Sequence, residues 1–326
     1  MSKPMPIPTD LDPGAPLHFI LNGQAGSQDG EATRAGIENA LAAAGRRGQL
    51  HACAPAELPR LAAALARQAV DEGGAIVAVG GDGTINTVAH AAHAAGCVMG
   101  VVPRGTFNYF ARAHGMATDA AQAAAQLLAA RVAPVQVAAV NQQIFLVNAS
   151  VGLYPDLLED REAWKARFGR SQIVALWAAA ATLLRAQRRL TLSASLDGEQ
   201  RELRTLTLFV GNNRLQLEQL GVLVDAGPDG ASDRGRVTAV VLKPIGTLAM
   251  LRLMLRGAMG SLGDDDGIER FAFQDMVVNP PRVMRLRRMK VAFDGEVAHM
   301  KPPLRFRVLP EPLYLLRPDA PQEAAT

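Results

Sequence analysis

The sequence predicts two domains, an N-terminal α/β domain built on a parallel sheet and a C-terminal β-rich, sandwich-like domain. Between residues 16 and 103, short apolar runs alternate with helix-like runs that end at glycine. Such alternation is typical of a parallel sheet with helices on both faces. After about residue 135 the pattern changes to strands joined by short turns. The 326 residues are enough for two domains and a substantial core.

The first domain is expected at residues 15–134, after a flexible, proline-rich leader over residues 1–14. Its strands are short apolar runs that end in turn residues, and its helices stop at glycine. We expect the strands at 16–22, 75–81 and 98–103. We expect the helices at 31–45, 58–74 and 84–96.

The second domain is expected at residues 135–309, and its sequence indicates mainly strands. The pair Asp197 and Gly198, in the run "LDGE", predicts a hairpin turn. Strands are expected in the runs that begin at 134, 189, 236, 282 and 303, and helices near 164–189 and 246–260. Residues 310–318 are expected to return as a strand that completes the first domain, followed by a tail over 319–326.

The composition indicates an ordinary globular protein of a reducing compartment. Hydrophobic residues make up 49% and charged residues 20%, and the net charge of +3 is too small to indicate a nucleic-acid partner. Cys53 and Cys97 provide no disulfide framework and no zinc-binding spacing. The longest apolar run, 173–184, is about half of a membrane span, and no signal peptide is visible. We therefore expect a cytoplasmic protein.

Three glycines, Gly80, Gly81 and Gly83, stand where a predicted strand ends and a helix begins. At such a position exposed backbone N–H groups and the helix dipole favour an anion such as phosphate. The alternative is a tight turn that needs glycine for its geometry alone. Neither standard phosphate motif fits, because no lysine follows and Asn86 stands where a dinucleotide fingerprint has its third glycine.

A second glycine loop follows the next strand, in residues 100–112. Pro103 and Gly105 indicate a tight turn, and Thr106 and Asn108 supply a hydroxyl and an amide. Because neighbouring parallel strands end at the same edge of a sheet, the two loops are expected to lie side by side. Together they predict a site for a polyphosphate.

These runs resemble the diacylglycerol kinase catalytic family, the bacterial lipid kinases related to sphingosine kinases. The resemblance rests on five runs in the family's order: "GGDGTINT" (80–87), "PRGTFNYFAR" (103–112), "NASVGL" (148–153), "VGNN" (210–213) and "FDGE" (293–296). It implies a nucleotide domain of the NAD kinase and diacylglycerol kinase type, with an active site between the two domains. It also implies ATP and Mg²⁺ as cofactors and a lipid such as diacylglycerol as the phosphoryl acceptor.

The resemblance also implies roles for individual residues. The general base is expected at Asp294, with Glu296 sharing that work or holding Mg²⁺. Asp82 is expected either to act through Mg²⁺ or to hold its loop by accepting backbone N–H bonds. The alternative for Asp294 is an Asp-Gly hairpin turn with solvent-exposed acids, as at Asp197. The nucleotide-binding residues are expected to be Asn22, Gly80, Gly81, Asp82, Gly83, Thr84, Asn86, Gly105, Thr106 and Asn108.

Three departures from the family pattern stand out. Tyr109 and Arg234 occupy positions where relatives carry the acids of a structural Mg²⁺ network, so we expect that dedicated metal site to be absent, with Asp233 the acid left nearby. Thr87 replaces the glutamate at the end of the first motif, and its role is unassigned. These departures keep a nucleotide-binding pseudokinase or regulator open as an alternative function, beside an NAD kinase-like enzyme.

A lipid acceptor also raises the question of membrane contact. Residues 282–290 combine basic side chains with Met and Leu, and basic residues flank the apolar run 173–184. Both features are compatible with peripheral binding to the anionic inner face of a membrane. A solvated strand face and an ordinary core helix with charged ends are equally good interpretations of the same residues.

Overall fold

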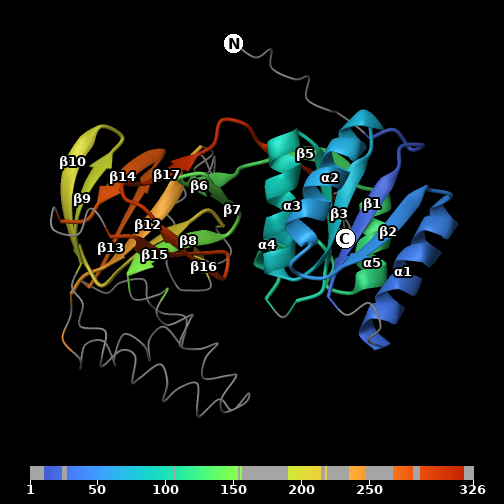
Figure 1. The fold of residues 1–326 in the computed structure, drawn as a ribbon, viewed down its shortest axis with the longest axis horizontal. Coiled ribbons are helices and arrows are strands. Elements are labelled where there is room, and N and C mark those ends of the chain that lie inside the picture. Colours follow the sequence, from blue (N-terminus) through green and yellow to red (C-terminus); the bar gives the residue numbers. More distant parts are fainter. Residues whose placement is uncertain are drawn as a thin grey trace, which may run out of the picture. The chain divides into compact units, whose positions relative to one another are not determined.

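The computed structural model describes residues 11–23, 28–105, 107–152, 155, 190–213, 217–218, 235–244, 246, 267–281 and 287–318. The chain forms two compact units (Figure 1). The first consists of the residues up to Val137 together with those from Pro310 onward, and the second consists of Ala138–Leu309. The predicted helices near 164–189 and 246–260 lie almost wholly outside the described residues.

The first unit is built on one six-stranded sheet in the order β2-β1-β3-β4-β18-β5. Its strands are β1 (Leu17–Asn22), β2 (Gly48–Cys53), β3 (Ala75–Gly80), β4 (Val98–Pro103), β5 (Arg131–Val135) and β18 (Leu313–Arg317). The first four run parallel to one another. β18 returns to the sheet parallel to β4 and pairs antiparallel with β5 at the edge. The α/β fold class with a parallel sheet is confirmed.

Helices pack on this sheet, as Figure 1 shows. They are α1 (Gln28–Ala44), α2 (Leu58–Asp71), α3 (Asp82–Ala95), the short α4 (Tyr109–Ala113) and α5 (Ala120–Leu128). α5 packs closely on β4 because Gly100 has no side chain, and a Cβ there would overlap Leu127. α3 begins two residues earlier than the sequence predicts, so that Asp82 and Gly83 belong to its first turn.

One strand of this sheet has no counterpart among the predicted elements. β2 is an edge strand of the sheet and is only partly buried. Its residues "GQLHAC" lack the continuous apolar character of the fully buried β3 and β4. An interior parallel strand is covered on both faces and therefore shows a continuous apolar run, whereas an edge strand need not.

The second unit contains two six-stranded sheets in the orders β10-β9-β14-β17-β6-β7 and β13-β12-β11-β8-β15-β16. All of the described strand pairs are antiparallel, which confirms a C-terminal region rich in antiparallel strands. Side chains from both sheets form one core that includes Phe145, Phe273 and Phe306, so the sheets pack as a sandwich.

The bounds of the second unit's strands are as follows. The first sheet has β6 (Ala138–Val140), β7 (Gln143–Phe145), β9 (Leu190–Leu196), β10 (Glu199–Thr205), β14 (Asp275–Asn279) and β17 (Leu304–Val308). The second has β8 (Asn148–Gly152), β11 (Thr207–Gly211), β12 (Val237–Leu242), β13 (Ile268–Phe273), β15 (Met289–Phe293) and β16 (Glu296–Met300). Within the described ranges, no helix is both long enough and apolar enough to cross a membrane.

Candidate functional site

The turn from β3 into α3 needs glycine for steric reasons. Gly80 ends β3, and a Cβ on it would lie 2.6 Å from both Cβ and Oγ1 of Thr84, which is buried in the first turn of α3. Gly81 is the N-cap residue, with extended backbone at φ −84° and ψ −175°. The helix thus begins directly at the sheet edge, with its unpaired backbone N–H groups at the carboxyl end of β3.

The second glycine loop lies directly against the first. β4 pairs parallel with β3, and the N–H of Arg104 donates to the carbonyl of Gly80 at 2.8 Å. A Cβ on Gly105 would lie 3.0 Å from the Cα of Gly81, so the two loops touch through their backbones. The structure therefore places the two loops side by side, as the sequence predicts.

Asp82 joins the two loops. Its Oδ2 accepts the backbone N–H of Asn108 at 3.0 Å, where the second loop enters α4. Its Oδ1 is buried and has no hydrogen-bond partner in the described part of the chain. Burial raises the pKa of this carboxyl, and the backbone N–H groups of Asn108, Phe110 and Tyr109 partly offset that effect. One oxygen therefore holds the second loop, while the other remains an acceptor.

A third loop, at the end of β1, contacts the same helix turn. The Asn22 amide donates from Nδ2 to Oγ1 of Thr84 at 2.9 Å. Its Oδ1, like Oδ1 of Asp82, is a buried acceptor without a hydrogen-bond partner among the described residues. Asn86, two residues after Thr84, is also buried. The carboxyl ends of β1, β3 and β4 thus supply one connected set of side chains.

Asn108 and Thr87 bond locally. The Asn108 amide accepts the N–H of Gly105 at 2.9 Å through Oδ1 and donates to the carbonyl of Gly105 at 2.7 Å through Nδ2. It therefore closes the loop around position 106 and does not point outward as a free amide. Thr106 itself lies outside the described residues. The Thr87 hydroxyl donates to the carbonyl of Gly83 at 3.0 Å, a local bond within α3.

In the second unit, Asp294 and Gly295 form the two-residue turn between β15 and β16, with φ of 44° and 88°. This is the Asp-Gly hairpin that the sequence left open as an alternative, but the acid is not solvent-exposed. Asp294 is only 7% exposed, and its carboxylate accepts the backbone N–H groups of Leu146, Val147 and Asn148 at 2.7, 2.9 and 2.9 Å. The side chain fastens the turn to the segment between β7 and β8.

Glu296 lies on the same turn in a different environment. It is the first residue of β16, it is exposed as a residue, and no hydrogen bond or ion pair engages its carboxylate in the described part of the chain. Neighbouring atoms nevertheless exclude water from part of the carboxyl, and this burial raises its pKa. A carboxylate with a raised pKa and unengaged oxygens is a better proton acceptor than one held by three N–H donors.

The other expected site residues stand as follows. Asp233 and Arg234 lie outside the described residues, as do 282–286 of the basic run 282–290 and the apolar run 173–184. Among the described residues no group of three or more His, Cys, Asp or Glu side chains is arranged to hold a metal ion. The side chains of Asp82 and Asn22 still present two buried oxygens, the ligand type that Mg²⁺ prefers.

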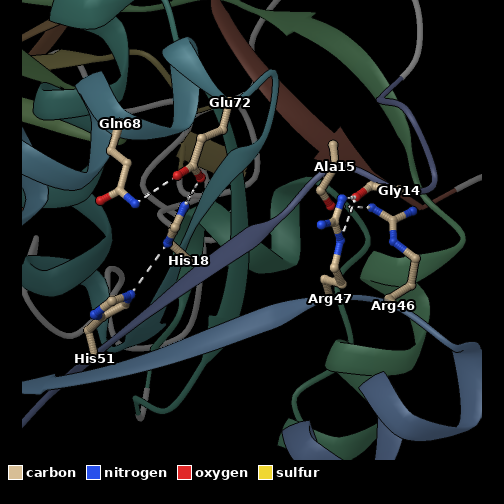
Figure 2. A network of polar contacts seen from close by, with 8 residues as sticks. All are labelled: Gly14, Ala15, His18, Arg46, Arg47, His51, Gln68 and Glu72. Carbon is tan, nitrogen blue, oxygen red and sulfur yellow. Dashed lines mark hydrogen bonds and ion pairs between the residues drawn. The ribbon is translucent and has the colours of Figure 1, made fainter.

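Sequence reasoning missed a polar network at the opposite, amino-terminal edge of the sheet (Figure 2). His18 is fully buried on β1, and its Nε2 lies 2.9 Å from Oε2 of Glu72. Its Nδ1 lies 3.4 Å from Nε2 of His51 on β2, and Gln68 donates to Glu72 at 2.8 Å. The apolar run around His18 gives no sign of these partners, which are distant in sequence. His18 is the second residue of β1 and Asn22 is its last, so the network lies towards the other end of this strand from the glycine loops.

Comparisons with known proteins find a match for the part of the chain that contains the two glycine loops. Residues 16–140 match the model of the diacylglycerol kinase catalytic domain. A Bacillus subtilis protein named diacylglycerol kinase is 28% identical over 235 residues, which cover 70% of this chain and 72% of that protein. A Klebsiella pneumoniae protein named "Probable lipid kinase YegS-like" is 39% identical over 79 residues. That match covers 24% of this chain and 27% of the relative, about a quarter of its length.

Solved structures extend the likeness to the fold of nearly the whole chain. The crystal structure of a diacylglycerol kinase from Bacillus anthracis is 22% identical, covers 93% of this chain and 96% of its own, and superposes with a TM-score of 0.63. Both units therefore share their fold with that protein. Residues 16–140, the part of the chain that matches the diacylglycerol kinase catalytic domain, contain Asn22 and both glycine loops.

Proposed function

We propose that the protein is an ATP-dependent lipid kinase that transfers the γ-phosphoryl group of ATP to a hydroxyl of a lipid such as diacylglycerol. The observation that carries this proposal is the contact between Gly81 and Gly105, with Asp82 bonded across it to Asn108. Two backbone loops without side chains at their point of contact leave room for a polyphosphate to approach N–H groups. The family of residues 16–140 supports ATP as the donor.

The residues of the first unit divide the work of binding. The N–H groups at the start of α3 and the glycine loops hold phosphate oxygens, while Asn22 and Thr84 support the turn from beneath. Mg²⁺, when bound with ATP, neutralises phosphate charge, and Oδ1 of Asp82 is the acceptor available to it. Asn108 shapes the loop that carries Thr106.

Proton removal from the acceptor is assigned to the Asp294–Glu296 turn. In this proposal Glu296 accepts the proton of the lipid hydroxyl, because its oxygens are unengaged and its pKa is raised by burial. Asp294 positions the turn through its three backbone N–H bonds. The sequence-based prediction of Asp294 as the base stays a prediction, and substitution of each acid separates the two assignments.

One experiment tests the function. The purified chain is incubated with γ-labelled ATP, Mg²⁺ and separate acceptors: diacylglycerol, phosphatidylglycerol, a sphingoid base and NAD. We expect label in a lipid. Label in NAD alone would favour the NAD kinase-like alternative, and nucleotide binding without transfer to any acceptor would favour a regulator. We place the reaction at the cytoplasmic face of the membrane, where ATP and the lipid acceptor meet.

A further inference from the structure

The second glycine loop carries an exposed aromatic ring. Phe107 is 46% exposed, and in the described part of the chain the other large hydrophobic residue of comparable exposure is Val70, at 41%. The ring of Phe107 stacks on that of Tyr109 with centroids 5.7 Å apart and planes 2° from parallel. Tyr109, which replaces the family's acid, thus has a role here as a support for Phe107.

The backbone beneath this pair is held firmly. Asn108, which stands between Phe107 and Tyr109 in the sequence, is buried. Its backbone N–H donates to Asp82, and its side-chain amide makes two hydrogen bonds to the backbone of Gly105. Phe110 and Ala111 turn inward from α4, whereas Arg112 is exposed. Phe107 is therefore presented on a fixed loop next to the phosphate site, and not on a chain end that happens to be exposed.

Basic residues flank the second glycine loop along the chain. Arg104 precedes the loop, Arg112 follows it on α4, and neither has an ion pair or side-chain hydrogen bond in the described part of the chain. Arg317, exposed at the end of β18, is close enough to His114 to contribute, after burial, to lowering the pKa of that histidine to about 4. Of the acids in this part of the chain that the structure describes, Asp82 accepts the N–H of Asn108 through Oδ2, and Asp119 caps α5 by accepting the N–H of Gln122.

We propose that these four residues, Phe107, Arg104, Arg112 and Arg317, form a surface that docks on an anionic lipid bilayer. The ring enters the headgroup region, where aromatic side chains are favoured, and the arginines bind the negative surface. This inference rests on the proposed function, because a lipid kinase must bring its phosphate site to a hydroxyl held in the bilayer. It also differs from the two basic regions that the sequence suggested, residues 282–290 and those flanking 173–184.

Three cations and one ring provide weak, reversible binding. Each arginine near an anionic leaflet is worth about 1 kcal/mol, which corresponds to about fivefold in partitioning. The size of this effect suits an enzyme that must leave the membrane surface after each encounter. A stacked nucleotide base is the competing occupant of Phe107, and the experiment separates the two.

The test is co-sedimentation of the full chain with vesicles of phosphatidylcholine, with or without phosphatidylglycerol. We expect binding only when phosphatidylglycerol is present. Phe107→Ser and the double variant Arg104→Gln/Arg112→Gln should each reduce binding, the latter by about 25-fold at low salt and less at high salt. The matched controls are Val70→Ser and Arg67→Gln, which remove an exposed apolar and an exposed basic side chain from α2. They should bind as the unchanged chain does.

ATP affinity, measured by calorimetry on the same variants, completes the experiment. Reduced vesicle binding in the absence of ATP, by Phe107→Ser and by the double variant but not by the two controls, supports the proposal. Reduced ATP affinity with unchanged vesicle binding would instead place the base on Phe107 and overturn it, as would equal vesicle binding by all variants. Circular dichroism checks that each variant is folded. Vesicle binding without phosphorylation of any lipid would support this docking surface and refute the proposed function.

Discussion

At the scale of single residues, adjacent glycines in the first loop do different work. Gly80 is required by packing, because a Cβ would collide with Thr84 at 2.6 Å. Gly81 has no such neighbour, since the nearest atom to its Cβ would be the Cα of Gly105 at 3.6 Å, and its φ of −84° suits any residue. Its lack of a side chain is therefore better explained by a ligand than by the fold.

This contrast yields a paired prediction. Gly80→Ala should lower the free energy of unfolding by about 1–3 kcal/mol, the usual cost of overpacking. Gly81→Ala should leave stability nearly unchanged and weaken ATP binding, because its methyl group enters the space proposed for phosphate. Urea denaturation and calorimetric titration with ATP measure the two effects. Loss of stability in both variants, with no specific effect on ATP binding, would indicate that both glycines serve only the geometry of a tight turn.

The second residue-scale prediction concerns pH. A carboxylate that serves as a base must be ionised, so activity should fall as the pH drops through the pKa of Glu296, which burial raises above its ordinary value of 4.5. Glu296→Gln should lower kcat by about 10²–10⁴-fold and abolish this fall in activity at low pH. If Asp294→Asn removes the fall at low pH while Glu296→Gln retains it, Asp294 is the base.

At the scale of elements, two Asp-Gly hairpins show how much a local pattern leaves open. Asp197 and Asp294 both lie at positive φ, and both accept backbone N–H bonds from a neighbouring segment. Asp197 is exposed, whereas Asp294 is buried. The turns themselves are predictable from Asp-Gly between strands. The burial of Asp294 is not, because it depends on Leu146, which is 148 residues away in the sequence.

The two hairpins therefore make a matched comparison of stability. Asp294→Ala should cost about 3 kcal/mol or more, because three buried N–H groups lose a charged acceptor. Asp197→Ala should cost less, about 1 kcal/mol, because water replaces the lost bonds to Gln274 and Asp275. Chemical denaturation of the whole chain measures both. Equal losses would contradict the role assigned to the buried carboxylate.

The same distinction explains which strands and site residues were predictable. β3 and β4 are buried at every residue, so their continuous apolar runs mark them clearly, and β4 matches its predicted bounds of 98–103. The edge strand β2 was missed because half-buried residues mix polar and apolar side chains. The loops of Gly81 and Gly105 were placed together from strand order alone. That Asn108 bonds within its own loop depends on its left-handed backbone at φ 47°, which no pattern in the sequence indicates.

At the scale of the whole molecule, three partly buried histidines lie in the first unit. His51, His90 and His114, all in the first unit, have lowered pKa values, chiefly because burial disfavours their charged forms. The pKa of His114 falls from 6.5 to about 4. Each of these histidines binds a proton less readily in the folded chain than in the unfolded chain, so unfolding below about pH 6.5 takes up protons.

We therefore expect the first unit to lose stability as the pH falls from about 6.5 towards 4, because the unfolded state binds more protons than the folded state there. Glu72, whose pKa is lowered by bonds from Gln68 and His18, adds to this loss only below its ordinary value of 4.5. Hydrogen exchange at pH 7 and pH 5, resolved by peptide, should show β1, β3 and β4 losing protection more than β8 and β11. His114→Phe keeps an aromatic ring against Phe110 and should make the decline shallower. A decline of equal size in both units, unaffected by that substitution, would mean that acid acts through groups other than these histidines.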